Sequence, residues 1–203
     1  MAELYLLTPP RIDAAFPALF ERTLKAGPVA AIQVRLKDHD PAEREAYARA
    51  LVGVAQGLGV TAVVNDDPAL AARVGADGVH VGQEDATYAE ARAAMGRAGI
   101  VGVTCHDSRH LAMEAGEKGA DYVAFGAFYP TVTKTPKTQA SLDILTWWSE
   151  LFEIPCVAIG GVTAETAPEL ARAGADYVAV SSGVWAAPEG PQAAVERLCA
   201  ALS

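Results

Sequence analysis

The chain has 203 residues, of which 51% are hydrophobic, and 25 acidic against 16 basic residues give it a formal net charge of −9. This length suffices for one domain with a large buried core. An acidic chain without a basic run is a poor candidate for binding nucleic acid or an anionic membrane, so an anion site would have to be a local group of cations.

Short apolar segments alternate with helical ones along the whole chain. The predicted strands cover residues 4–7, 31–36, 61–64, 78–81, 100–105, 122–127, 156–159 and 177–181. The predicted helices cover residues 13–25, 41–58, 68–74, 88–95, 108–117, 142–152, 163–172 and 191–202, with Trp147 and Trp148 as packing residues. This alternation predicts an α/β fold, a small TIM (β/α)8 barrel that takes up residues 1–203 as one domain. A doubly wound open sheet is the alternative.

The second predicted strand is more polar than the others. Residues 32–37 alternate apolar and polar side chains, so Gln33, Arg35 and Lys37 share one face of the strand. An ordinary solvent-facing strand shows the same alternation. The other predicted strands are apolar on both faces, as in a parallel sheet covered by helices. In such a sheet the polar face would point inward and would suit a polyanionic ligand.

Active sites of TIM barrels form at the carboxyl ends of the strands, where this chain has several polar residues. Asn65 and Asp66 follow the third strand and are available for the barrel mouth, because Asp67 before Pro68 is predicted to cap the next helix. Asp85, after the fourth strand, could be a metal ligand or the cap of the following helix.

The remaining strand ends supply hydroxyls, histidines and small residues. Thr104 and His106 close the fifth strand, and His106 and His80 are each interpreted first as hydrogen-bonded core or rim histidines. The long polar loop at 129–138 is of a kind that is usually functional or flexible. Small residues follow the last two predicted strands, at 160–161 and 181–183, and would let backbone N–H groups approach a phosphate.

The barrel mouth would thus bring three cations, Arg35, Lys37 and Lys134, beside the carboxylates of Asp66 and Asp85. Mg²⁺ takes one or two carboxylates together with phosphate oxygens, so this group suits Mg²⁺ bridging a pyrophosphate. With the phosphate-binding turns on the other side of the mouth, two phosphorylated groups would meet between them.

A Gly-Ala-Asp repeat occurs at 75–77, 119–121 and 174–176, each time between a predicted helix and a predicted strand. Glycine suits the C′ position of a helix, and aspartate can cap the turn that follows. These aspartates would lie at the bottom of a barrel, where residues contribute to stability rather than catalysis.

Several other classes of protein are disfavoured. The three cysteines, Cys105, Cys156 and Cys199, are odd in number and widely spaced, so buried free thiols are expected rather than disulfides or a zinc site. The chain has neither an apolar run approaching roughly 18 residues nor a leader pattern at its start. Protease, Walker A and dinucleotide motifs are missing. A cytoplasmic protein acting on small molecules is expected, with a homo-oligomer left open.

A series of motifs runs through nearly the whole chain: Gln33-x-Arg35-x-Lys37, Asn65-Asp66, the block 75–85, Gly102-Val103-Thr104, Tyr129-Pro130-Thr131-x-Thr133-Lys134 and Ile159-Gly160-Gly161. This series resembles the thiamine phosphate synthase family, most specifically in the block 75–85 and the loop at 130–134. The resemblance implies a TIM barrel that joins hydroxymethylpyrimidine diphosphate to thiazole phosphate, with release of pyrophosphate.

The resemblance also implies residue roles. Pyrimidine diphosphate would be bound by Gln33, Arg35, Lys37, Asn65, Thr104 and Lys134. Thiazole phosphate would be bound by Thr131, Thr133, Gly161, Ser181 and Ser182. Mg²⁺ would be bound by Asp66 and Asp85. The catalytic residues would be Arg35, Lys37, Thr104 and Lys134, which stabilise charge on the leaving pyrophosphate without a general base.

The chain departs from the family pattern in a few places. Thr104 stands where serine is usual and keeps the hydroxyl, whereas Ser181 replaces a common isoleucine. Thr166 stands where asparagine is frequent, and residues 139–141 lack the usual glycine. These departures bear on loop closure and thiazole affinity rather than on the reaction.

Three rival functions are considered. A thiazole tautomerase, similar in fold, would use a histidine, with His106 as the candidate, and would have disrupted diphosphate and metal residues. A non-catalytic ligand-binding protein of the thiamine pathway would bind both phosphates without turnover. Another phosphate-binding barrel, such as an epimerase or aldolase, is the third; an aldolase would need a Schiff-base lysine on an apolar strand, and none is evident.

Overall fold

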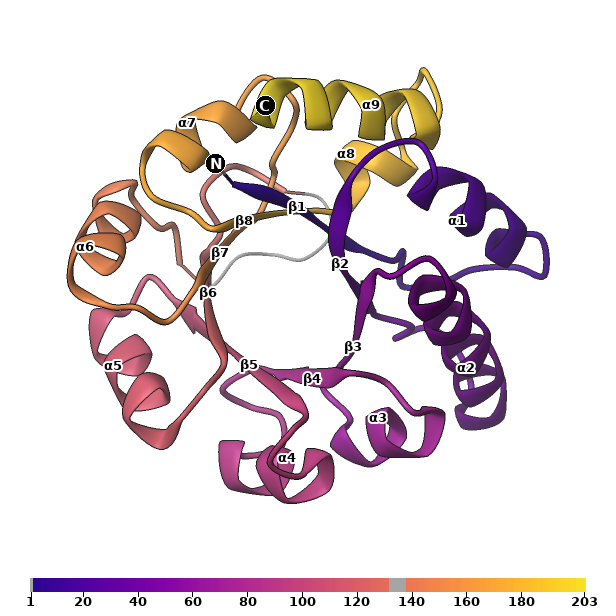
Figure 1. The fold of residues 1–203 in the computed structure, drawn as a ribbon, viewed down its shortest axis with the longest axis horizontal. Helices are drawn as coiled ribbons and strands as arrows, with labels where there is room; N and C mark the ends of the chain where they lie inside the picture. Colours follow the sequence, from indigo (N-terminus) through magenta and orange to yellow (C-terminus); the bar gives the residue numbers. More distant parts are fainter. Residues whose placement is uncertain (1, 132–137) are drawn as a thin grey trace.

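The computed structural model describes residues 2–131 and 138–203. Eight parallel strands form a closed barrel in chain order (Figure 1). The strands are β1 (Glu3–Leu7), β2 (Val29–Val34), β3 (Thr61–Asn65), β4 (Gly78–Val81), β5 (Ile100–His106), β6 (Tyr122–Gly126), β7 (Cys156–Ile159) and β8 (Tyr177–Val180). The TIM-barrel prediction is confirmed. The open sheet is wrong, because β8 pairs back with β1 and closes the sheet.

The helices form a ring around the barrel (Figure 1). They are α1 (Phe16–Leu24), α2 (Pro41–Gly57), α3 (Pro68–Val74), α4 (Tyr88–Met95), α5 (Arg109–Lys118), α6 (Asp143–Leu151), α7 (Ala167–Arg172), α8 (Ser182–Trp185) and α9 (Pro191–Leu202). The sequence predicted a turn, not a helix, where α8 lies. This single turn is anchored by Trp185, whose Nε1–H donates to the carbonyl oxygen of Leu7 at 2.6 Å and whose ring packs on Phe16.

Several element boundaries differ from the prediction; for example, α7 begins at Ala167 rather than at residue 163. Two of the differences have a clear local reason. Strand β2 ends at Val34, because the next backbone N–H, that of Arg35, donates to Thr8 Oγ1 at 2.8 Å. Helix α1 begins at Phe16 rather than at Asp13, because Asp13 Oδ1 accepts from two following backbone N–H groups and forms a turn ahead of the helix. The predicted cap of α3 is confirmed, since Asp67 Oδ1 accepts from Leu70 N at 2.8 Å.

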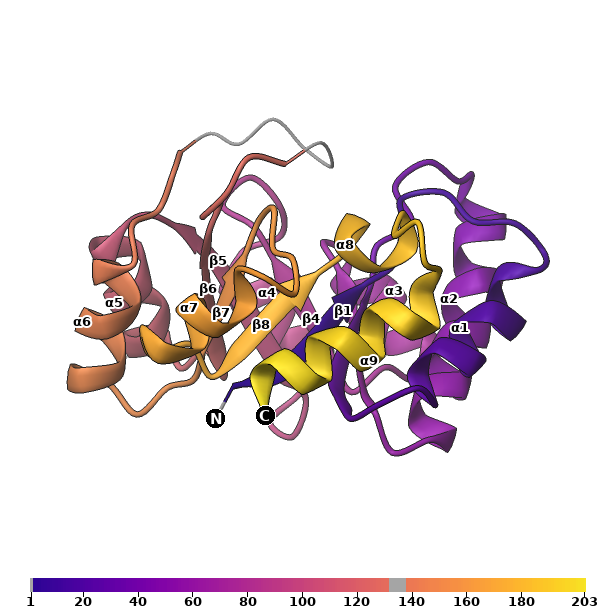
Figure 2. The same cartoon turned by 90° about the horizontal axis from the view of Figure 1, so that it is seen from above.

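The repeated aspartates lie at the end of the barrel where the strands begin, which is also where both termini lie (Figure 2). Asp77, Asp121 and Asp176 precede β4, β6 and β8, and their carboxylates accept from a backbone N–H of β3, β5 and β7 at 2.8, 2.7 and 2.8 Å. Each aspartate therefore ties its own strand to the preceding one. The structural interpretation holds, but the bond reaches the neighbouring strand rather than the following turn.

The core has two parts, one inside the barrel and one between the barrel and the helices. The inner cluster consists of Tyr5, Leu7, Val63, Tyr122, Ala124, Val157 and Ala179. In the outer part, Trp148 is fully buried, donates from Nε1 to the carbonyl oxygen of Ile154 at 2.7 Å and stacks on Phe152, so its packing role is confirmed.

The cysteines are free thiols, as predicted. Cys105 and Cys156 are buried and Cys199 is half-buried, which is less burial than the sequence suggested for the last of them. Across residues 2–131 and 138–203, none of the helices combines the length and the apolar character that crossing a membrane requires.

Candidate active site

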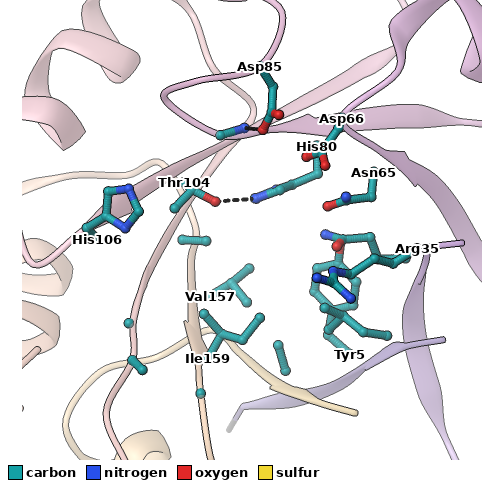
Figure 3. A pocket seen from close by; sticks show the side chains of 18 of the residues that line it. Tyr5, Arg35, Asn65, Asp66, His80, Asp85, Thr104, His106, Val157 and Ile159 are labelled. Carbon is teal, nitrogen blue, oxygen red and sulfur yellow. Dashed lines mark hydrogen bonds between the residues drawn. The ribbon is translucent and has the colours of Figure 1, made fainter. Parts of the chain in front are cut away.

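A cavity of about 310 Å³ lies inside the barrel mouth (Figure 3). Of the predicted site residues, it is lined by Gln33, Arg35, Lys37, Asn65, Asp66, Asp85, Thr104 and Thr131. These residues lie in β2, β3 and β5 or in the loops after β2, β3, β4 and β6, so closure of the barrel brings them together.

The other predicted site residues are not found among the described residues that line this cavity. Gly161, Ser181 and Ser182 do not line this cavity, although Gly160 does. Thr133 and Lys134 lie outside the described residues.

The cation and carboxylate groups gather on one side of the cavity. Lys37 Nζ lies 2.7 Å from Asp66 Oδ2. Asp85 adjoins Asp66, and its Oδ2 accepts from Gly82 N at 2.9 Å. The pKa of Asp85 is raised, first by burial and then by the hydrogen bond and negative charge of Asp66, while the Gly82 N–H and Lys37 oppose the rise. Two carboxylates therefore meet, and within the described residues Lys37 is the positive side chain that acts on both.

This carboxylate pair fits the magnesium ion that the sequence predicts. A divalent cation would relieve the repulsion that raises the pKa of Asp85. Within the described part of the chain, no group of three or more His, Cys, Asp and Glu side chains could hold a metal. Mg²⁺ is commonly bound by only one or two carboxylates together with substrate phosphates and water, so the pair is the kind of protein ligand set that it uses.

Asp85 is not the cap of the helix that follows it. Thr87 caps α4: its hydroxyl accepts from the backbone N–H of Glu90, and the Glu90 carboxylate accepts from the backbone N–H of Thr87. Of the two roles that the sequence left open for Asp85, the capping role is wrong. Its carboxylate remains at the cavity.

The turn after β7 comes very close to the loop after β6. Gly161 has φ 66°, and a Cβ there would overlap the carbonyl oxygen of Pro130. Only glycine fits this position without strain. The root of the same loop is held to α7, because the Tyr129 hydroxyl donates to Glu169 Oε2 at 2.9 Å. Gly160 from this turn and Thr131 from this loop both line the cavity.

Five side chains form a continuous hydrogen-bond chain across the barrel interior. Gln33 Nε2 donates to the Tyr5 hydroxyl at 3.3 Å, and the Tyr5 and Tyr122 oxygens are 2.9 Å apart. The Tyr122 hydroxyl is 2.9 Å from His80 Nδ1. His80 Nε2 is 2.7 Å from Thr104 Oγ1 (Figure 3). His80 is thus the hydrogen-bonded core histidine that the sequence suggested, although it also lines the cavity.

Tyr5 and Tyr122 also line the cavity, although neither was among the predicted site residues. The sequence could have indicated them, because side chains alternate between the two faces of a strand. The same alternation that placed Gln33 on the inner face of β2 places Tyr5 and Tyr122 on the inner faces of β1 and β6. His106 also lines the cavity, at the end of β5 with φ 55°.

The burial of His80 makes the stability of the protein depend on pH. Burial lowers the pKa of His80 from 6.5 to about 4, against a smaller opposing effect of Asp85. Between these values the unfolded state binds more protons than the folded state, so the free energy of unfolding falls as pH falls from 6.5 to 4. We expect His80 to account for about 2 kcal/mol of the stability lost between pH 7 and pH 5 in urea unfolding.

The matched variant for this prediction is His80→Gln, which has no imidazole to protonate. Its free energy of unfolding should fall by about 2 kcal/mol less than that of the parent protein over the same pH interval. An equal fall in both proteins would show that another group is responsible.

Comparisons with known proteins identify the family of this chain. The model of the thiamine monophosphate synthase family matches residues 4–184. A curated thiamine-phosphate synthase from Rhodospirillum centenum is 61% identical over 196 residues, covering 95% of this chain and 93% of that protein. Another, from Erythrobacter litoralis, is 50% identical over 205 residues, covering 98% and 96%.

Solved structures give the same result. A thiamine phosphate pyrophosphorylase from Pyrococcus furiosus superposes with a TM-score of 0.86 at 31% identity, covering 98% of this chain and 95% of that chain. A 3-hexulose-6-phosphate synthase, at a TM-score of 0.72 and 20% identity, shares the fold alone. Because the family model and close relatives match over most of the sequence, the chain belongs to the thiamine monophosphate synthase family.

Proposed function

We propose that this protein is a Mg²⁺-dependent transferase that forms thiamine phosphate. Its substrates are 4-amino-2-methyl-5-hydroxymethylpyrimidine diphosphate and 4-methyl-5-(2-hydroxyethyl)thiazole phosphate, and pyrophosphate is released. The observation that carries the proposal is the group of Lys37, Asp66 and Asp85 on one side of the cavity, after β2, β3 and β4. Thr131 and Gly160 line the cavity from the other side, after β6 and β7.

The diphosphate would lie on the side of Lys37. Lys37 is held by Asp66 at 2.7 Å, so its ammonium group is already placed at the cavity wall, and Arg35 lines the same region. Gln33 is 4% exposed and lies deeper, where it and Asn65 offer hydrogen bonds to an aminopyrimidine ring. Thr104 would donate to the diphosphate, and Lys134 completes the set by resemblance to the family.

Asp66 and Asp85 would hold the Mg²⁺ ion. When bound, the ion supplies charge neutralisation to the leaving pyrophosphate. The protein supplies two adjacent carboxylates, one of which accepts from a backbone N–H that fixes its orientation.

The thiazole phosphate would lie on the side of the glycine turn. Gly160 and Thr131 line the cavity there, so a backbone group and a hydroxyl are available to the phosphate, and Gly161 is assigned to it by resemblance. Thr133, Ser181 and Ser182 are assigned to this phosphate by resemblance.

The chemistry requires charge stabilisation and alignment rather than a general base. The bond between the pyrimidine methylene carbon and the diphosphate oxygen breaks, and both electrons leave with pyrophosphate. The thiazole nitrogen then forms the new carbon–nitrogen bond. Arg35 and Lys37 stabilise the negative charge that develops, and a cavity that holds both substrates aligns the nitrogen with the carbon.

The test is to mix the purified protein with both substrates and Mg²⁺ and to measure thiamine phosphate and pyrophosphate in equal amounts. Omission of either substrate, and addition of a chelator, should each abolish the product. Isomerisation of a thiazole carboxylate phosphate without thiamine phosphate would overturn the proposal in favour of a tautomerase, with His106 as its candidate residue. Binding of both substrates without turnover would favour a ligand-binding protein.

A further inference from the structure

We propose that the buried hydrogen-bond chain (Gln33, Tyr5, Tyr122, His80 and Thr104) fixes which ring nitrogen of His80 carries a hydrogen and thereby points the hydroxyl hydrogen of Thr104 into the catalytic cavity. Gln33 and the two tyrosines would then be positioning residues for Thr104. The inference rests on the proposed function only where it assigns an oxygen of the diphosphate as the acceptor for Thr104.

Gln33 sets which atom donates in each bond of this hydrogen-bond chain. Its Nε2 can only donate, so the Tyr5 oxygen accepts at 3.3 Å. Tyr5 is 4% exposed, and among the described residues Tyr122 is the one other partner of its hydroxyl, at 2.9 Å. A buried hydroxyl hydrogen without an acceptor is costly, so Tyr5 donates to Tyr122.

The donors and acceptors at His80 and Thr104 then follow. With its oxygen accepting from Tyr5, the Tyr122 hydroxyl donates to His80 Nδ1 at 2.9 Å. His80 is 7% exposed, and each of its ring nitrogens faces one hydroxyl; in a neutral imidazole one ring nitrogen accepts and the other donates. Nδ1 accepts, and Nε2–H therefore donates to Thr104 Oγ1 at 2.7 Å. The hydroxyl hydrogen of Thr104 is left for an acceptor in the cavity that Thr104 lines.

The opposite order of donors and acceptors along the hydrogen-bond chain would leave Thr104 unable to donate to an anion. If Thr104 donated to His80 Nε2, then Nδ1–H would donate to Tyr122 and Tyr122 to Tyr5. The Tyr5 hydrogen would then lack an acceptor in the described part of the chain, because Gln33 presents an N–H group to it. Thr104 would turn only oxygen lone pairs toward a phosphate oxygen, and these repel each other.

The first measurement is the position of the imidazole hydrogen in the ligand-free protein. Spectra that correlate ¹⁵N-labelled ring nitrogens with ring hydrogens distinguish the two neutral forms, and the His80 signals among the four histidines are those lost in His80→Gln. We expect the hydrogen on Nε2. In Gln33→Glu the new carboxylate accepts from the Tyr5 hydroxyl, which reverses the donor and the acceptor in every later bond of the hydrogen-bond chain. The imidazole hydrogen of His80 should therefore move to Nδ1.

A matched pair of tyrosine variants tests the link to ligand binding. Tyr122→Phe removes the donor to Nδ1 and should mix the two forms of His80, with an increase of about tenfold in the dissociation constant of Mg²⁺-pyrophosphate. Tyr177→Phe removes the hydroxyl of another inward-facing tyrosine, on β8, which makes no hydrogen bond among the described residues, and should change neither quantity. In a Thr104→Val background, Tyr122→Phe should have no further effect on this affinity.

A hydrogen on Nδ1 in the parent protein, or one that stays on Nε2 in Gln33→Glu, would overturn the inference. The spectra do not depend on any ligand, so they separate this inference from the proposed function. If the hydrogen is on Nε2 but Thr104→Val binds Mg²⁺-pyrophosphate like the parent, the direction of the chain is supported and the assignment of Thr104 to the diphosphate is contradicted.

Discussion

Replacement of Asp66 or Asp85 by asparagine is expected to lower kcat/KM by at least about a hundredfold. Each carboxylate is half of the pair proposed to hold Mg²⁺ beside Lys37. Asparagine keeps the size of the side chain and removes its charge. It also tolerates the left-handed conformation of Asp66, whose φ is 65°, so the loss would not come from backbone strain. The measurement is kcat/KM as a function of Mg²⁺ concentration.

The matched control for the carboxylate variants is Asp107→Asn. Asp107 is an exposed acidic residue in the loop after β5, and it is not part of the cavity lining. This change should leave both turnover and the magnesium requirement as they are. If Asp66→Asn and Asp85→Asn kept the parental dependence on Mg²⁺, the metal ligands would have been wrongly assigned.

Gly102→Ala is expected to destabilise the protein by about 3 kcal/mol and to abolish most turnover with it. Gly102 on β5 lies opposite Tyr122 on β6, and a Cβ at Gly102 would overlap the Tyr122 ring. Tyr122 is buried and hydrogen-bonded to Tyr5 and His80, so it cannot move aside without breaking these bonds. Urea unfolding gives the change in free energy.

Gly53→Ala provides a control with the opposite sign. Gly53 is exposed in the middle of α2, and a Cβ there meets nothing within 4 Å. Because alanine favours the helix more than glycine does, this change should stabilise the protein by about 0.5–1 kcal/mol. Parental stability in Gly102→Ala would show that Tyr122 is not confined by close packing on β5.

The barrel and one wall of its site could be predicted from sequence because both depend on local patterns. Alternating strands and helices imply parallel strands in chain order, and the period of two in β2 placed Gln33 on the inner face. The ends of β3 and β4 were close enough in the predicted order to bring Asp66 and Asp85 together. The solvent-facing interpretation of the polar stripe is wrong for Gln33, which is buried.

Contacts across the barrel could not be predicted in the same way. Tyr5 and Tyr122 are separated by 117 residues and come from strands that are not neighbours, so their meeting depends on the diameter of the closed barrel and on the space left by Gly102. Likewise, the end of β2 depends on a hydrogen bond from Arg35 to Thr8, which belongs to another loop. The anchoring of α8 depends on Trp185 reaching the end of β1.

The aspartates that join neighbouring strands keep the residues that maintain the fold apart from the residues that determine the substrate. Asp77, Asp121 and Asp176 hold the strands together in pairs at the end of the barrel opposite the cavity. These bonds involve no residue of the loops at the mouth. The bottom of the barrel can therefore preserve the fold while residues of the mouth diverge toward new substrates, which is how one scaffold comes to carry many activities.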